Sequence, residues 1–155
     1  MGKIIQPAHA EIGRIISELL GKTATVTAAS EPAVASHVGI FLFRDESLGM
    51  VAAGDAAAVA YSGSALTMIP KGVADEAIAE GKPTEMQVDC FQEVMNVVSQ
   101  AWNLAGGDHI RLVSTKSAAE LTDAERSLLA GGSTQLHVTL DVQGYGSGTI
   151  TFGGV

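Results

Sequence analysis

The sequence predicts an α+β fold in which two intertwined helix–strand–strand–strand repeats form an antiparallel sheet with long helices packed on it. Two segments far apart in the chain each combine an amphipathic helix that ends at glycine with three strand-like runs. No low-complexity linker or run of charges separates these halves. We therefore expect a single domain over residues 1–155, with the first repeat at about 4–54, a helical insert at 55–83 and the second repeat at about 84–155.

The first repeat opens with an apolar-periodic segment at about residues 8–20, and Gly21 can end this helix. Short runs with few charges and several β-branched or aromatic residues follow. They predict strands at 23–27, 38–43 and 48–53.

The insert is rich in alanine and predicts two helices. The first covers residues 55–68 and is closed by Pro70. The second covers residues 73–80 and is closed by Gly81.

The second repeat starts with the longest predicted helix. Thr84 and Gln87 fit a capping box at its start, and the Gly106-Gly107 pair can end it. A second capping box, Thr122 with Glu125, predicts a short helix inside this repeat. Strand-like runs complete the repeat at 109–113, 135–142 and 148–152, and a glycine-rich hairpin turn joins the last two.

The composition restricts the classes of partner. The chain has a formal net charge of −8 and an isoelectric point near 4.8, whereas nucleic acids and anionic membranes call for a basic surface. No apolar stretch approaches the roughly 20 residues of a membrane span, and the N-terminus lacks a signal-peptide pattern. The single cysteine, Cys90, cannot form an intramolecular disulfide. We therefore expect a cytoplasmic protein that binds neither nucleic acid nor membrane.

The long predicted helix divides into a polar side and an apolar side. At about 100° per residue, one narrow stripe holds the polar residues Asp89, Glu93, Asn96, Gln100 and Asn103. The opposite side holds the apolar residues Phe91, Val94, Met95, Val98, Trp102 and Ala105. Such a helix buries its apolar side and presents its acid and amide groups outward.

A solvated helix face is the ordinary explanation of such a stripe. The residue types favour a site, because solvated faces usually carry Lys, Arg and Glu, and no Lys or Arg occurs between Lys82 and Arg111. The asparagines also occupy a helix interior that they do not favour. Functional sites are expected where local propensity is given up in this way.

The pattern Asp89-x-x-x-Glu93-x-x-Asn96, on a long helix of an acidic chain with two α/β repeats, resembles the signature of the CheC/CheX chemotaxis phosphatases and their flagellar-switch relatives. The resemblance implies a CheC-like fold over essentially the whole chain. It also implies hydrolysis of the aspartyl-phosphate of a CheY-like response regulator, whose receiver domain is the partner. The chain then needs no cofactor of its own, because the regulator would hold Mg²⁺ and supply a lysine.

The resemblance and the chemistry of the side chains together assign roles to the stripe. Asn96 would hold the attacking water in line, because a carboxamide both donates and accepts hydrogen bonds. Glu93 would bind the active-site lysine of the regulator and so determine how the regulator is positioned along the helix. Asp89 and Gln100 flank the pair and would bind the partner.

Departures from the family pattern keep other functions open. No proline follows Pro83, although the family pattern continues with a proline after the asparagine. In the first repeat, Glu11 matches Glu93, whereas Arg14 stands where an asparagine is expected. The main alternative is a non-catalytic adaptor that binds a response regulator or a flagellar-switch component through the same helix. A structural dimer module with a solvated helix is a third possibility, and a homodimer paired through edge strands stays open in every case.

Other candidate sites are weaker. No two histidines have metal-ligand spacing on one helix face, so no metal site is expected from His9, His37, His109 and His137. Cys90 and Trp102 are predicted to pack in the core. The glycines at 144–148 predict a hairpin turn and not a phosphate loop, because no helix follows them.

Overall fold

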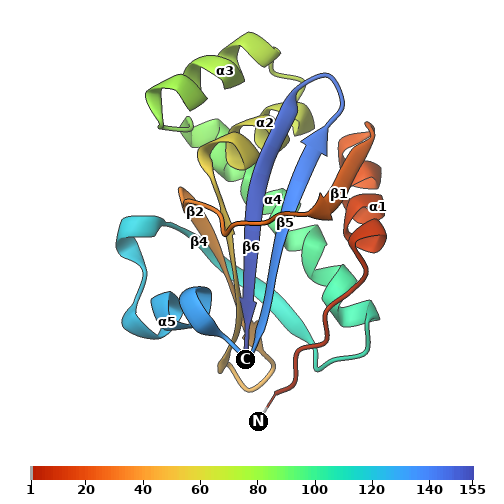
Figure 1. The fold of residues 1–155 in the computed structure, drawn as a ribbon, viewed down its shortest axis with the longest axis vertical. Coiled ribbons are helices and arrows are strands. Elements are labelled where there is room, and N and C mark those ends of the chain that lie inside the picture. The colour runs from red at the N-terminus through yellow and green to blue at the C-terminus, as the bar shows by residue number, and fades with distance from the viewer. Residues whose placement is uncertain (1) are drawn as a thin grey trace.

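The sheet has six strands that pair in antiparallel fashion throughout, in the order β1-β5-β6-β3-β2-β4 (Figure 1). The structure is a computed structural model that describes residues 2–155. Its elements in chain order are α1 (His9–Leu20), β1 (Ala24–Ala28), β2 (His37–Phe43), β3 (Leu48–Gly54), α2 (Ala56–Leu66), α3 (Lys71–Glu80), α4 (Glu85–Leu104), β4 (Ile110–Ser117), the short 3-10 helix η1 (Ala118–Glu120), α5 (Asp123–Gly131), β5 (Thr134–Val142) and β6 (Gly146–Gly154).

The strand order shows how the two repeats intertwine. Strand β1 of the first repeat pairs with β5 of the second, and β4 of the second pairs with β2 of the first. In the centre, β3 of the first repeat pairs with β6 of the second. Strands β1, β2 and β3 of the first repeat correspond to β4, β5 and β6 of the second. With this correspondence, the strand order is the same whether it is read from one edge of the sheet or from the other. This confirms the predicted α+β fold of two intertwined repeats around an antiparallel sheet.

Most element bounds agree with the prediction to within a few residues, and β4 differs most. The sequence predicts a strand over 109–113, whereas β4 continues to Ser117 and pairs with β2 up to His37. The added residues, Ser114 to Ser117, are polar and lack the apolar alternation that marks a strand. Pairing with a neighbouring strand, and not local pattern, therefore sets the end of β4.

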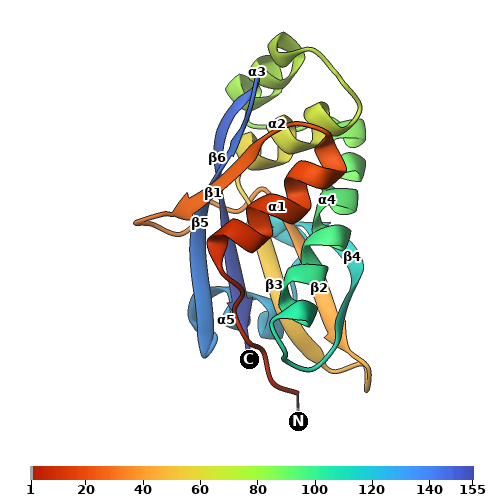
Figure 2. The same ribbon diagram turned by 90° about the vertical axis from the view of Figure 1, so that its right-hand side faces the viewer.

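The helices cover the two faces of the sheet unequally. Helices α1, α2 and α4 lie together on one face (Figure 2). Helix α5 covers part of the other face, where Leu128 and Leu129 pack against Val38, Ile40 and Val51. Helix α3 lies outside these layers, at the top of Figure 1, and packs on α2 through alanine side chains. None of the helices in residues 2–155 is long and apolar enough to cross a membrane.

The main core fills the space between the sheet and the layer of α1, α2 and α4. The apolar side of α4 is buried there, as predicted: Phe91, Val94, Met95, Val98 and Trp102. The ring centroids of Trp102 and Phe152 lie 4.4 Å apart, and Cys90 is also buried, as predicted. Burying a large apolar side chain stabilises the fold by about 1.5 to 3 kcal/mol, so this stripe fixes which side of α4 faces inward.

The helix ends follow the predicted local chemistry. In α4, Thr84 N–H donates to Gln87 Oε1 at 2.8 Å, and Gln87 N–H donates to Thr84 Oγ1 at 3.2 Å. The predicted capping box of Thr122 and Glu125 likewise opens α5. Gly21 ends α1 with a φ of 66°, the left-handed conformation that glycine adopts without steric cost.

Helix α2 fixes the position of α4 by close backbone contact. A Cβ atom on Gly63 would collide with the carbonyl oxygen of Gln87, so the two helices can approach this closely only at a glycine. The same Gln87 donates from Nε2 to Ser64 Oγ at 3.1 Å. The N-cap Asp55 in turn accepts a hydrogen bond from Thr149 N–H at 3.1 Å, which joins α2 to the sheet.

Each repeat ties its first helix to its first strand through one polar side chain. Ser17 Oγ donates to Ala24 O at 3.1 Å and accepts from Ala24 N–H at 2.8 Å. Asn103 Nδ2 donates to Ile110 O at 3.0 Å, and its Oδ1 accepts from Ile110 N–H at 2.9 Å. Both tethers span seven residues and satisfy both backbone groups of a strand residue. Ser17 and Asn103 therefore occupy equivalent places in the two repeats.

The tethers define the register in which the two repeats correspond. Buried positions agree in this register: Ile12, Gly13, Ile15 and Ile16 of α1 match Val98, Ser99, Ala101 and Trp102 of α4. Glu11 then corresponds to Val97, and Arg14 to Gln100. The match of Glu11 with Glu93 drawn from the sequence is therefore wrong by about one helical turn. The apolar pattern of a helix repeats at every turn, so a slip of one turn leaves it intact.

Candidate functional site

The predicted site residues lie on the outer side of α4. Asp89, Glu93, Asn96 and Gln100 are all exposed, and they follow one another at each turn of the helix. The opposite side of α4 is buried in the core. The structure thus brings these four residues onto one surface.

Glu93 and Asn96 are neighbours on this surface. Residues three apart on a helix have Cβ atoms about 5 to 6 Å apart. The backbone carbonyl of Asn96 accepts from Ser99 Oγ at 2.7 Å, and this bond leaves the carboxamide unengaged. Within residues 2–155, the side chains of Glu93 and Asn96 form no hydrogen bond or ion pair. A partner can therefore bind both groups without breaking an internal contact.

The helix that carries the pair is held at both ends. Its first turn is fixed by Gln87, which completes the capping box and also binds Ser64. Its last turn is fixed by Asn103, whose amide binds the backbone of Ile110. Asn103 was predicted to belong to the outward polar stripe, but it is half-buried and acts as a tether. Sites built on helices that are locked by such contacts hold their geometry better than sites on loops.

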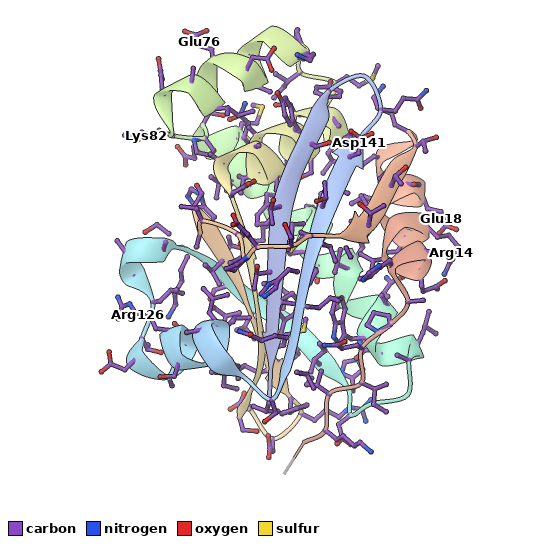
Figure 3. The ribbon with its side chains drawn as sticks, viewed as in Figure 1. Arg14, Glu18, Glu76, Lys82, Arg126 and Asp141 are labelled. Atoms are coloured by element: carbon purple, nitrogen blue, oxygen red, sulfur yellow. The ribbon has the colours of Figure 1, made fainter. Side chains whose placement is uncertain are left out.

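The matching face of α1 is occupied by internal ion pairs. The Arg14 guanidinium binds the carboxylates of both Glu11 and Glu18, with an Nη1 to Oε1 distance of 2.8 Å to Glu18. Figure 3 shows Arg14 and Glu18 on the outer side of α1. The hydrogen bond from Arg14 lowers the pKa of the Glu11 carboxyl below its ordinary value. This face therefore offers no free carboxylate beside an amide.

Helix α4 also extends further than α1 at its N-terminal end. In the register of the tethers, His9 at the start of α1 corresponds to Met95 of α4. The preceding turns of α4, which carry Asp89 and Glu93, have no helical counterpart in the first repeat. An acid and an amide in this arrangement are therefore found on α4 and not on α1.

The main hollows of the described residues lie away from the pair. None of the main hollows formed by the described part of the chain is lined by Asp89, Glu93 or Asn96. One hollow lies at the C-terminal end of α4, where Leu104 and Pro7 are among the lining residues. Small-molecule sites are concave, so this exposed helix suits a protein partner better.

The other polar candidates have structural partners. His37 Nδ1 lies 2.9 Å from Ser36 Oγ, and His137 Nδ1 lies 3.0 Å from Thr151 Oγ1. Burial lowers the pKa of His37, which favours its neutral form. In residues 2–155, no group of three His, Cys, Asp or Glu side chains is placed to hold a metal ion.

The sequence did not single out the apolar residues that border this face. Met86 and Leu104, at the two ends of α4, are exposed, and so is Met68 after α2. Helix periodicity alone places Met86 and Leu104 on this face, seven residues before and eleven after Glu93, whereas the exposure of Met68 depends on how α2 packs. These residues extend the candidate surface beyond the polar stripe.

Solved structures of low sequence identity share this fold. FliM from H. pylori, solved in complex with SpeE, gives a TM-score of 0.63 at 9% identity, over 94% of this chain and 80% of that chain. FliY from Thermotoga maritima gives 0.62 at 11% identity, over 95% and 83%. CheX from Vibrio vulnificus gives 0.50 at 12% identity, over 93% of both chains. The chain has the CheC-like fold.

The likeness is one of structure. No protein-family model matches the sequence, and a comparison with curated proteins also finds no match. The resemblance inferred from the pattern on α4 is therefore confirmed at the level of the CheC-like fold. The roles of individual residues on α4 rest on their geometry and chemistry.

Proposed function

We propose that this chain is a phosphatase that hydrolyses the aspartyl-phosphate of a CheY-like response regulator. The observation that carries the proposal is the free pair of Glu93 and Asn96 in the middle of a rigid, exposed helix. The CheC-like fold adds support, since a chemotaxis protein, CheX from V. vulnificus, shares it. Because such regulators act in the cytoplasm, the proposal places the chain there as well.

The reaction transfers the phosphoryl group from the regulator to water. The water oxygen forms a bond to phosphorus while the bond from phosphorus to the aspartate oxygen breaks. The aspartate leaves as a carboxylate, and the proton lost by the water passes to the released phosphate or to solvent. In this mechanism the regulator would hold Mg²⁺ and supply a lysine, which would neutralise charge on the phosphoryl oxygens, so this chain supplies only positioning. Positioning alone lowers such a barrier by several kcal/mol.

Asn96 and Glu93 divide the task. The carboxamide of Asn96 accepts a hydrogen bond from the attacking water and can donate one to a phosphoryl oxygen, which aligns the water for in-line attack. The carboxylate of Glu93 forms a charge-assisted hydrogen bond with the lysine of the regulator. Asp89 and Gln100, one turn to either side, contact the same partner and set its orientation along the helix.

A non-catalytic adaptor is the second candidate function. The FliM and FliY structures give TM-scores of 0.63 and 0.62, against 0.50 for CheX. FliM from H. pylori has been solved in complexes with FliG and with SpeE. In this case, the face of α4 binds a response regulator or a flagellar-switch component and no hydrolysis follows.

The proposal is tested by the decay of phosphorylated receiver domains from the same genome, each purified singly, with and without this chain. The chain is expected to accelerate the loss of phosphate from at least one of them. Asn96→Ala and Glu93→Ala are expected to return the rate toward intrinsic decay, whereas Arg14→Ala on α1 should keep the acceleration. Acceleration that survives both α4 substitutions would refute the phosphatase proposal. A receiver that binds but decays at its intrinsic rate supports the adaptor.

A further inference from the structure

The exposed face of α4 is longer than the acid–amide pair and ends in apolar side chains. Met86 in the first turn is 57% exposed, and Leu104 in the last turn is 70% exposed. They lie about 27 Å apart along the helix at a rise of 1.5 Å per residue. Glu93 and Asn96 lie near the midpoint. The face therefore has a polar centre between two apolar ends.

A second methionine adds to the N-terminal end of this face. Met68 follows Thr67, whose Oγ1 lies 3.9 Å from Cys90 Sγ on α4. Met68 is 78% exposed, and its φ of 58° lies in the left-handed region that favours glycine. The turn after α2 thus carries an exposed apolar side chain where a glycine would fit with less strain. Residues held in unfavourable backbone conformations are found most often at functional sites.

The charge of the face selects the chemistry of its partner. Its acidic groups are Glu85, Asp89 and Glu93, and no Lys or Arg occurs between Lys82 and Arg111. Two copies of this chain that met through α4 would bring carboxylates together, and juxtaposed like charges cost several kcal/mol. A partner with a cationic centre and apolar surroundings is complementary to the face.

We infer that Met68, Met86 and Leu104 are the apolar anchors that hold the receiver domain on α4, on either side of the acid–amide pair. The inference rests on the proposed function, because the receiver domain is the partner proposed there. A standard protein interface buries about 800 Å² per partner, which is about 28 Å across, so one domain can cover the whole helix. Methionine is unbranched and adapts to the shape of the surface it meets.

The anchors and the pair then have separable effects. The anchors exclude water around the pair and set how tightly the receiver binds. Asn96 acts on the water and sets how fast the bound phosphoryl group is lost. Substitution of an anchor therefore changes affinity, whereas substitution of Asn96 changes turnover.

The experiment compares two polar substitutions on this face with one on the far face. Met86→Gln combined with Leu104→Gln, and separately Met68→Gln, are tested for binding to a beryllofluoride-activated receiver domain and for dephosphorylation. Val34→Gln is the matched control, since Val34 is 86% exposed in the loop that crosses the opposite face of the sheet (Figure 1). Equal urea midpoints establish that the variants are folded.

The paired substitution is expected to raise Kd about tenfold or more, as loss of central apolar contacts does in other interfaces. Met68→Gln should raise it by a smaller factor, Val34→Gln should leave it unchanged, and the rate at saturating receiver should stay within about twofold of wild type. If the paired substitution raises Kd no more than Val34→Gln does, these residues are not anchors, and the proposed phosphatase activity is unaffected by that result. If the chain forms a dimer and the paired substitution dissociates it, the anchor proposal is also refuted, because a second copy then covers the face. A wild-type chain that neither binds nor dephosphorylates any receiver refutes the proposed function itself.

Discussion

Helices α1 and α4 are equivalent in the two repeats, yet they use their outer faces differently. Both bury an apolar side against the sheet, and both are tethered to the following strand by a polar side chain. On α1, Arg14 forms ion pairs with two carboxylates, so the charged groups of the outer face are paired within the chain. On α4, an acid and an amide remain free in the middle of a longer helix.

The comparison teaches that the duplicated architecture needs the buried side and the tether, but not a particular outer face. One outer face is satisfied within the chain, and the other is left for a partner. The added N-terminal turns of α4 carry the carboxylates Asp89 and Glu93, which the shorter α1 has no room to match. Function is therefore expected to be sensitive to substitutions on α4 and insensitive to the same substitutions on α1.

Reversal of charge gives the largest expected contrast between the helices. Glu93→Lys places a cation against the lysine of the regulator, and juxtaposed like charges cost several kcal/mol, so kcat/KM for dephosphorylation should fall about 100-fold or more. Glu18→Lys on the exposed face of α1 is the matched change and should alter kcat/KM by less than about twofold. Both variants are measured with the same phosphorylated receiver. An equal fall in kcat/KM would show that the outer faces of α1 and α4 do not differ in function.

The tethers give the next largest effect, and here the two helices should behave alike. Asn103→Ala leaves the N–H and C=O of buried Ile110 without their partner and should reduce the free energy of unfolding by about 1 to 3 kcal/mol. Ser17→Ala removes the same pair of bonds at Ala24 and should cost about 1 kcal/mol. Urea unfolding measures both, with Gln100→Ala as the exposed control on α4. A cost at one tether only would show that the repeats do not correspond in this register.

The ion pairs of α1 give the smallest effect. The pKa of Glu11 lies below its ordinary value of 4.5 because Arg14 hydrogen-bonds to it, so Arg14→Ala should raise this pKa toward 4.5. The contribution of the pair to stability is present above the ordinary pKa and is lost as pH falls through the lowered one. An NMR titration of the Glu11 carboxyl measures the shift. If Arg14→Ala left the pKa of Glu11 unchanged, Glu11 would not pair with Arg14 in solution.

Much of this fold could be predicted because its signals are local. Thr84 and Gln87 form the predicted capping box, and Gly21 ends the predicted helix, since caps depend on residues close in sequence. The apolar side of α4 also followed from its period. The polar end of β4 could not be predicted, because its strand conformation depends on pairing with β2.

The site was predicted in part for the same reason. Asp89, Glu93 and Asn96 share a face because helix geometry alone places them together. The structural role of Asn103 was missed, since its partner Ile110 is brought to it by the turn after α4. The exposed Met68 was also missed, because its place beside α4 depends on tertiary packing of α2.

The most direct measurement of the central claim pairs binding with turnover for Asn96→Ala. The account predicts that this variant binds a beryllofluoride-activated receiver domain with a Kd within about threefold of wild type, yet accelerates loss of phosphate at least about 100-fold less. Such a result assigns the amide of α4 to the attacking water. Acceleration equal to wild type, with binding intact, would contradict the account and leave α4 as a docking surface alone.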